Sequence, residues 1–169
     1  MTLPAFPASL ARVLGKLPVM PVSLAMTGAL NLIAWRGLRD LDWSAMQGRR
    51  FCVRVRDTGL RAYFSVAARG FVPQVAEVAD VTFSASAEDF ARLALRLEDP
   101  DTLFFNRRLL IEGDTDLGLR VKNLLDGVEL ETLTAAMPGG IGTLVTRLRE
   151  RARGREQSIG ASAHFPGST

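Results

Sequence analysis

Apolar and polar residues alternate strictly over residues 50–56. Phe51, Val53 and Val55 fall on one side of this segment, and arginines and Cys52 fall on the other. Successive side chains of a strand point to opposite faces, so a period of two is typical of a half-buried strand. The segment is therefore predicted to be a strand with one apolar face.

Three further segments extend this predicted sheet. Residues 57–59 form a turn, after which residues 60–66 alternate again, and the pattern recurs at 71–72 and 81–84. Pro73 indicates an edge strand or the end of a strand, because proline cannot donate to a strand ladder. The sequence predicts an antiparallel meander followed by a crossover.

Two helices with one apolar face each follow the alternating segments. Ser86 is the expected N-cap of the first helix, and Asp114 or Thr115 is that of the second. Between them, Asp99-Pro100 ends the first helix, and residues 109–111 form a short buried strand. About five strands with helices on one side predict an α+β fold. The apolar stripes are Phe90, Leu93, Ala94 and Leu97, then Leu117, Val121 and Leu124.

The N-terminal part contains an uncharged run over residues 17–35. Two prolines interrupt it, so the predicted helix begins with Ser23 as its cap and ends near Trp35. Such a helix is about 20 Å long and too short for the roughly 30 Å hydrocarbon core of a bilayer. Residues 1–40 are interpreted as an apolar helical extension. The sequence leaves four roles open for this extension: packing on the sheet, a homodimer contact through residues 17–38, a cover over a lipid site, or contact with a membrane.

Residues 138–156 are predicted to form a basic amphipathic helix after the breaker at residues 138–140. Its apolar residues fall within an arc of about 100°, and arginines lie at the edges of that arc. This pattern is typical of a helix in a membrane interface, and docking on the chain's own domain is the alternative. Residues 157–169 have nothing to pack against and are expected to be disordered. The predicted membrane-surface residues are Leu144, Leu148, Arg147, Arg149 and Arg151.

The composition fits one packed domain of 169 residues, 47% of them apolar. The net charge of +3 is unevenly distributed. Residues 1–50 carry 6 basic and 2 acidic side chains, residues 51–140 carry 10 and 14, and residues 141–169 carry 5 and 2. Basic ends suit an anionic membrane surface at least as well as nucleic acid. Cys52 is the sole cysteine, which excludes an intrachain disulfide and favours the cytoplasm.

Side chains that usually carry catalysis or bind metals are scarce. The sole histidine, His164, lies in the predicted tail and has no rigid partner. Glu112, Asp114 and Asp116 lack the spacing of a calcium loop, and turn and cap roles explain them. We therefore expect no enzyme activity, no metal site and no cofactor.

The run DPDTLFFNRRLLIEGDTDLGLRVKNLLD at residues 99–126, with the alternating strands before it, resembles the lipid-binding domain of the sterol carrier protein family. The resemblance implies a sterol-carrier-type domain over residues 41–137. In that fold, helices cover one face of a five-stranded, mainly antiparallel sheet, and an apolar tunnel lies between sheet and helices.

The run is also similar to bacterial members of the family that assist oxygen-independent ubiquinone biosynthesis. That similarity implies a non-catalytic accessory factor that binds isoprenoid quinone intermediates or acidic phospholipids. Such a factor would work in the cytoplasm at the inner-membrane surface and present its ligand to ubiquinone-biosynthesis enzymes, among them hydroxylases.

Apolar side chains are expected to converge on one side of the sheet, where they either fill the core or line a tunnel. The resemblance favours a tunnel. The predicted lipid-binding residues are Phe51, Val53, Val55, Phe64, Phe83, Phe104, Phe105 and Leu110.

Two other functions compete with lipid binding. The first is an RNA-binding sheet that uses Arg54, Arg56, Arg61 and Tyr63 on the outer face. A single tyrosine is a poor stacking platform, so nucleic acid is disfavoured. The second is a purely structural assembly subunit.

Overall fold

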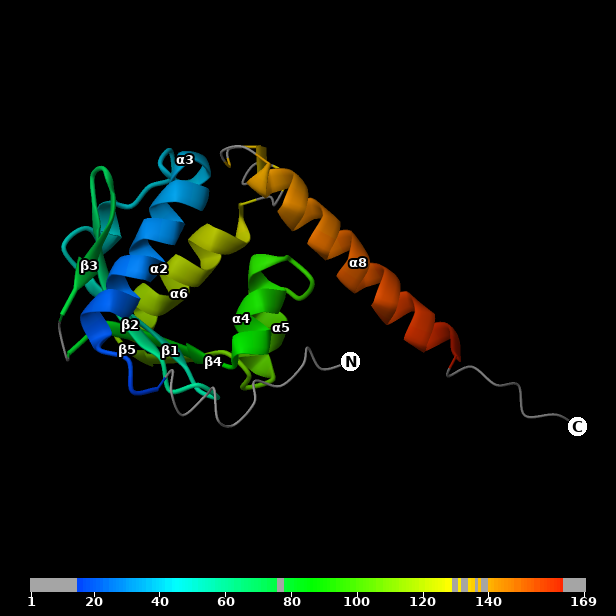
Figure 1. Ribbon diagram of the computed structural model, residues 1–169. Helices are drawn as coiled ribbons and strands as arrows, with labels where there is room; N and C mark the ends of the chain where they lie inside the picture. The colour runs from blue at the N-terminus through cyan, green and yellow to red at the C-terminus, as the bar shows by residue number, and fades with distance from the viewer. Residues whose placement is uncertain are drawn as a thin grey trace, which may run out of the picture.

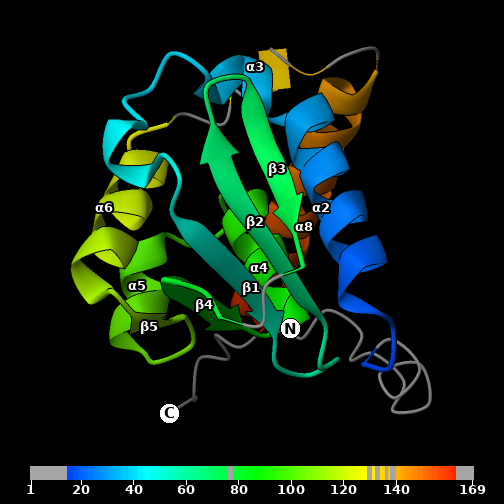
Figure 2. The same ribbon diagram turned by 90° about the vertical axis from the view of Figure 1, so that its left-hand side faces the viewer.

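The computed structural model describes residues 15–75, 78–128, 131, 134, 135, 137 and 140–162, with only the backbone described for residues 155–162. One five-stranded sheet forms its centre, and helices pack on one face (Figures 1 and 2). The strands are β1 (Arg50–Val55), β2 (Arg61–Ala67), β3 (Gly70–Gln74), β4 (Val81–Ala85) and β5 (Leu110–Gly113). The helices are α2 (Val19–Ile33), α3 (Trp35–Leu38), α4 (Ala87–Ala94), α5 (Pro100–Phe105), α6 (Thr115–Asp126) and α8 (Ile141–Ser162), with a 3-10 turn η1 (Ser44–Met46).

The strand order is β3-β2-β1-β4-β5. β1 pairs antiparallel with β2 and parallel with β4, and both outer pairs are antiparallel. The parallel pair arises because the chain crosses from β3 at one edge to β4 on the other side of β1. The predicted α+β fold with a mainly antiparallel sheet is confirmed, and Pro73 lies on an edge strand as expected.

The strand register brings apolar side chains onto one face. Phe51 lies opposite Phe64 in β2 and Val81 in β4, and Val53 lies opposite Ala62. α2 contacts β2 and β3, and α6 contacts β4 and β5. The apolar face is therefore covered by α2 at one side and α6 at the other.

A chain of aromatic contacts forms the core beneath α2. The ring centroids of Trp35 and Phe71 are 5.5 Å apart, those of Phe71 and Phe64 5.6 Å, and those of Phe64 and Phe51 5.5 Å. Trp43 also packs edge-on against Phe71 at 5.7 Å. Phe51 is only 1% exposed, so its ring is buried within this aromatic cluster.

α2 begins at Val19, so the prediction that Ser23 caps it was wrong. Pro18 occupies the N-cap position, and Pro21 lies in the first turn, where a missing N–H costs no helical hydrogen bond. Ser23 is fully buried within the helix. Its hydroxyl accepts a hydrogen bond from the backbone N–H of Tyr63 at 2.9 Å.

The segment around Asp99-Pro100 both separates two helices and starts the second. Ser86 caps α4 as predicted, accepting from the N–H of Asp89 at 3.1 Å. Asp99 then caps α5 by accepting from the N–H of Thr102 at 2.7 Å, and Pro100 occupies the first helical position. Proline is favoured at that position, which explains a helix where the sequence suggested none.

α6 packs tightly on the sheet. Asp114 caps it by accepting from the N–H of Leu117 at 3.1 Å, as predicted. A Cβ at Gly118 would lie 2.2 Å from Cγ2 of Ile111, so only glycine allows this approach between α6 and β5.

α8 extends away from the sheet (Figure 1). It runs to Ser162 rather than ending at residue 156 as predicted. The predicted tail beyond residue 162, with His164, lies outside the described residues, as do residues 1–14 of the N-terminal extension. Among the described helices, none is both long and apolar enough to cross a membrane.

Candidate lipid-binding site

An apolar cavity of about 400 Å³ lies between the first half of α2 and the β1–β2 hairpin. This volume is within the range of small-molecule sites. No charged or hydrogen-bonding side chain lines the cavity, so its chemistry suits a hydrocarbon chain. The lining residues are Leu17, Pro21, Val22, Ala25, Met26, Val53, Val55, Leu60 and Ala62.

Two polar side chains of α2 hold it over the strands. Ser23 accepts from the backbone of Tyr63, and Asn31 exchanges two hydrogen bonds of 2.8 Å with the backbone of Phe71. The two anchors are eight residues apart, roughly two turns or 12 Å of helix. They therefore fix the axis of α2, and the apolar side chains of its first half face the hairpin.

Two of the predicted lipid-binding residues, Val53 and Val55, line this cavity. Phe51 belongs to the neighbouring core, with Phe64 and Phe83 packed against it. The structure therefore places five of the predicted residues on one apolar face, but only the two valines border open space. Their contact with lipid remains a prediction.

The structure does not bring Phe104, Phe105 and Leu110 to that face. Phe104 and Phe105 lie on α5, and Phe105 is 78% exposed. Leu110 lies opposite Ser84 on the outer face of the sheet. The expectation that all eight residues converge on one face was therefore wrong for these three. Pro100 starts a helix that carries Phe104 and Phe105, and the β5 register turns Leu110 outward.

None of the residues on the α2 side of the cavity was among the predicted site residues. Leu17, Pro21, Val22, Ala25 and Met26 form this side. The available signal was the uncharged run over residues 17–35, for which a cover over a lipid site was one interpretation. Periodicity could not show which side of this helix faces the cavity, because apolar residues occupy most of its faces.

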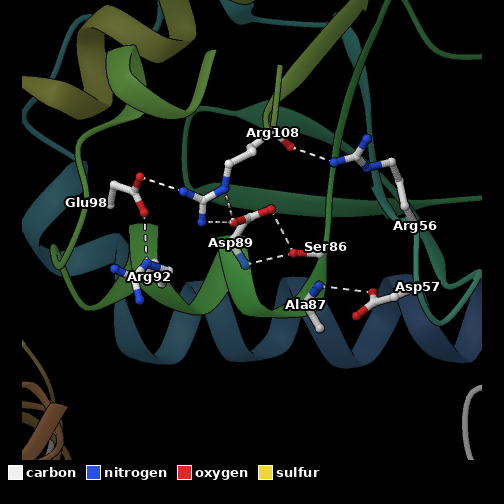
Figure 3. A network of polar contacts seen from close by, with 8 residues as sticks. All are labelled: Arg56, Asp57, Ser86, Ala87, Asp89, Arg92, Glu98 and Arg108. Atoms are coloured by element: carbon white, nitrogen blue, oxygen red, sulfur yellow. Dashed lines mark hydrogen bonds and ion pairs between the residues drawn. The ribbon is translucent and has the colours of Figure 1, made fainter. Parts of the chain in front are cut away.

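A network of polar contacts lies where α4 follows β4 (Figure 3). The guanidinium of Arg108 donates to Glu98 at 2.6 Å and to Asp89. Glu98 also accepts from Nε of Arg92 at 2.8 Å. Asp89 is 5% exposed and accepts from the hydroxyl of Ser86 at 2.7 Å. These charges compensate one another, so the network has a structural role.

The same network extends to the β1–β2 hairpin (Figure 3). Nη2 of Arg56 donates to the backbone carbonyl of Arg108 at 2.9 Å, and the N–H of Ala87 donates to Asp57 at 3.0 Å. The hairpin, the start of α4 and the turn before β5 are therefore joined as one surface.

The outer face of the sheet is polar, and Arg54 is paired within it. Arg54 donates to Ser84 at 3.1 Å and to Glu112 at 2.5 Å. Tyr63 is only 6% exposed, so it presents no ring on which a base could stack. Burial raises the pKa of the Cys52 thiol, which keeps it protonated at neutral pH. Within the described residues, no group of three His, Cys, Asp or Glu could hold a metal ion.

α8 presents most of its predicted membrane-surface residues to solvent. Leu144 and Leu148 are exposed apolar side chains, and Arg147 and Arg151 are exposed beside them. Arg149 differs, because it is mostly buried and donates to Glu131 at 2.9 Å. Two leucines of the α8 stripe are thus exposed, while Ile141 and Val145 are half-buried and one arginine is engaged with the chain itself.

Comparison with known proteins relates this chain to one protein family. The profile of the SCP-2 sterol transfer family matches residues 39–126, so α2 and its wall of the cavity precede the matched part. Among solved structures, "UbiJ-SCP2 Ubiquinone synthesis protein" has a TM-score of 0.47 at 21% identity, covering 64% of this chain and 96% of that chain. Palmitated SCP2L2 from Aedes aegypti has a TM-score of 0.42 at 13% identity, covering 67% and 98%.

Sequence similarity gives a narrower relationship. Over 120 residues the chain is 42% identical to "Ubiquinone biosynthesis accessory factor UbiT" of Escherichia coli strain K12. The matched region covers 69% of this chain and 69% of the relative. The proteins of that name from strains O6:H1 and O157:H7 match equally well. The chain belongs to the SCP-2 sterol transfer family and is a UbiT-like member of it.

Proposed function

We propose that this protein is a non-catalytic lipid-binding accessory factor in ubiquinone biosynthesis. It takes the tail of a prenylated quinone precursor or of a phospholipid into the cavity beneath α2 and presents the lipid to pathway enzymes at the membrane. The observation that carries this proposal is a cavity of about 400 Å³ that is lined only by apolar side chains.

The energetics of such a cavity suit reversible transfer. Burial of each CH₂ contributes about 0.8 kcal/mol relative to water, so ten carbons contribute roughly 8 kcal/mol. Relative to a bilayer the gain is near zero, because lipid tails are equally apolar. A protein with this balance can remove a lipid from a membrane and return it.

The ubiquinone role is supported by the name of the E. coli relative, an accessory factor of that pathway. We place this protein in the oxygen-independent branch, with the hydroxylases of that branch as partners. The charged side chains of the network beside α4 are paired with one another (Figure 3), which supports a carrier rather than a catalyst.

α8 provides a means of staying near the membrane. Its exposed Leu144 and Leu148 form an apolar stripe, with Arg147 and Arg151 beside it. Each cation near anionic lipid contributes about 1 kcal/mol. We propose that α8 lies in the interface and keeps the cavity close to its source of lipid.

A homodimer through residues 17–38 is an alternative role for the outer side of α2. Leu24 and Leu32 are exposed there, and Gly28 has open space beside it. If this face self-associates, Leu24→Glu and Leu32→Glu should reduce the molar mass measured by light scattering to that of the monomer. A monomeric parent protein would remove this alternative.

The cavity is tested by filling it. Native mass spectrometry of the purified protein should show a bound isoprenoid quinone intermediate or phospholipid. Ala25→Trp projects into the cavity and should abolish loading, whereas Ala29→Trp on the same helix does not line it and should load normally. The proposal fails if the protein is empty and gains nothing from extracted membranes, or if Ala25→Trp loads like its control.

A further inference from the structure

We infer that the end of the sheet bearing the cavity is a docking face for an anionic lipid bilayer, distinct from α8. We call it the cavity end and define it by residues 16–17, 56–61 and 105–108. The inference rests on the proposed lipid-binding function, and it specifies which side of the folded domain meets the membrane.

The topology brings these segments to one end. β1 is parallel to β4, so both strands finish there, while β2 and β5 begin there because they are antiparallel to them. The start of α2, the β1–β2 turn and the end of α5 lie toward the lower end in both Figure 1 and Figure 2. The contacts of Arg56 and Asp57 described above join the turn to the segment before β5.

The cavity end exposes large apolar side chains at both of its sides. Phe105 is 78% exposed at the end of α5, and Leu17 is 45% exposed while it also lines the cavity. Phe105 gains little from folding at such exposure, because most of its ring stays in water. Insertion into the acyl boundary of a bilayer would bury both side chains.

The charges at this end are unbalanced. Lys16, Arg61 and Arg107 are exposed, and neither Lys16 nor Arg107 forms an ion pair with an acidic residue in the described parts of the chain. The acidic side chains nearby are Asp57, which accepts from the N–H of Ala87, the half-buried Glu88, and Asp89 and Glu98, which are paired with Arg108. Positive charge therefore predominates.

The opposite end of the sheet lacks this excess. Arg49 pairs with Asp114 at 2.9 Å and with Asp80 at 3.7 Å, and Arg50 also lies 3.7 Å from Asp80. Exposed cations beside exposed apolar side chains match the chemistry of an anionic membrane surface. Docking this end would let a lipid tail move from the bilayer into the cavity without crossing water.

The charge component is tested by sedimentation of the full-length protein with vesicles. The vesicles contain phosphatidylcholine alone, or two parts phosphatidylcholine to one part phosphatidylglycerol. Each of Lys16→Gln and Arg107→Gln should weaken binding to the mixed vesicles about fivefold. The matched control is Arg69→Gln, an exposed arginine in the β2–β3 turn at the opposite end, which should bind like the parent. Equal losses in all three variants would overturn the inference.

The apolar component is tested by fluorescence. In Phe105→Trp, the added emission should shift to shorter wavelength when mixed vesicles are added, and in Val72→Trp, on the opposite part of the sheet, it should not. An unshifted Phe105→Trp spectrum would also overturn the inference.

Uptake of a fluorescent fatty acid without vesicles reports the cavity separately. Uptake without docking refutes the docking face alone, whereas absent uptake refutes the proposed function.

Discussion

Asn31 and Phe71 are joined by two hydrogen bonds that close the open edge of the sheet. Nδ2 of Asn31 donates to the carbonyl of Phe71, and the N–H of Phe71 donates to Oδ1 of Asn31, both at 2.8 Å. A side-chain amide thus supplies the donor and acceptor that a neighbouring strand would supply. Because the pair also positions α2, it links sheet stability to the shape of the cavity.

Asn31→Leu should lower the free energy of unfolding by about 1–3 kcal/mol, because it leaves the backbone groups of Phe71 without these partners. Urea denaturation measures the loss. The adjacent exposed residue provides the control, since Leu32→Ala should change stability by less than about 0.5 kcal/mol. A parent-like midpoint for Asn31→Leu would show that the pair is not stabilising.

Two phenylalanines should respond oppositely to truncation. Phe51→Ala removes a ring that is 1% exposed and stacked on Phe64, and should cost about 3–5 kcal/mol. Phe105→Ala removes an exposed ring and should cost less than about 0.5 kcal/mol. Thermal unfolding of both variants checks the contrast. Similar losses would mean that Phe105 is packed in solution.

Asp89→Asn should destabilise the fold by about 1.5–3 kcal/mol, because it removes the buried negative charge that accepts from Arg108. Glu98 still faces the guanidinium and limits the loss. Glu88→Gln, one residue away on α4, should be nearly neutral. Urea midpoints compare the two, and equal midpoints would argue that the network is dispensable.

Alkaline pH should destabilise the protein. Burial raises the pKa of Cys52 above its ordinary value of 9.0, and burial, with Cys52 nearby, raises the pKa of Tyr63 above 10.0. Folding therefore favours the protonated forms, and this contribution is present below about pH 9 and lost as the pH rises through the folded-state pKa values. Cys52→Ala should flatten the decline above about pH 9 in urea titrations. An unchanged profile would mean that the thiol does not contribute.

Local sequence patterns correctly predicted the strand faces and the helix caps, which depend on residues close together in the chain. Alternation placed Phe51, Val53 and Val55 on one face, and the caps at Ser86 and Asp114 form as expected. Asp99-Pro100 shows the limit, because this dipeptide both ends one helix and begins another. The choice depends on whether the following apolar residues can pack, as Leu103 does.

The sequence alone determined that the protein has a mainly antiparallel sheet with one apolar face, an uncharged N-terminal helix and an arginine-edged C-terminal helix. These properties follow from side-chain periodicity, charge and capping, which act between near neighbours. Tertiary structure decided where the open space lies. The cavity exists because Ser23 and Asn31 hold α2 over the hairpin, while the phenylalanines beside it interlock and leave no room. Packing between distant segments sets that difference, and no local pattern encodes it.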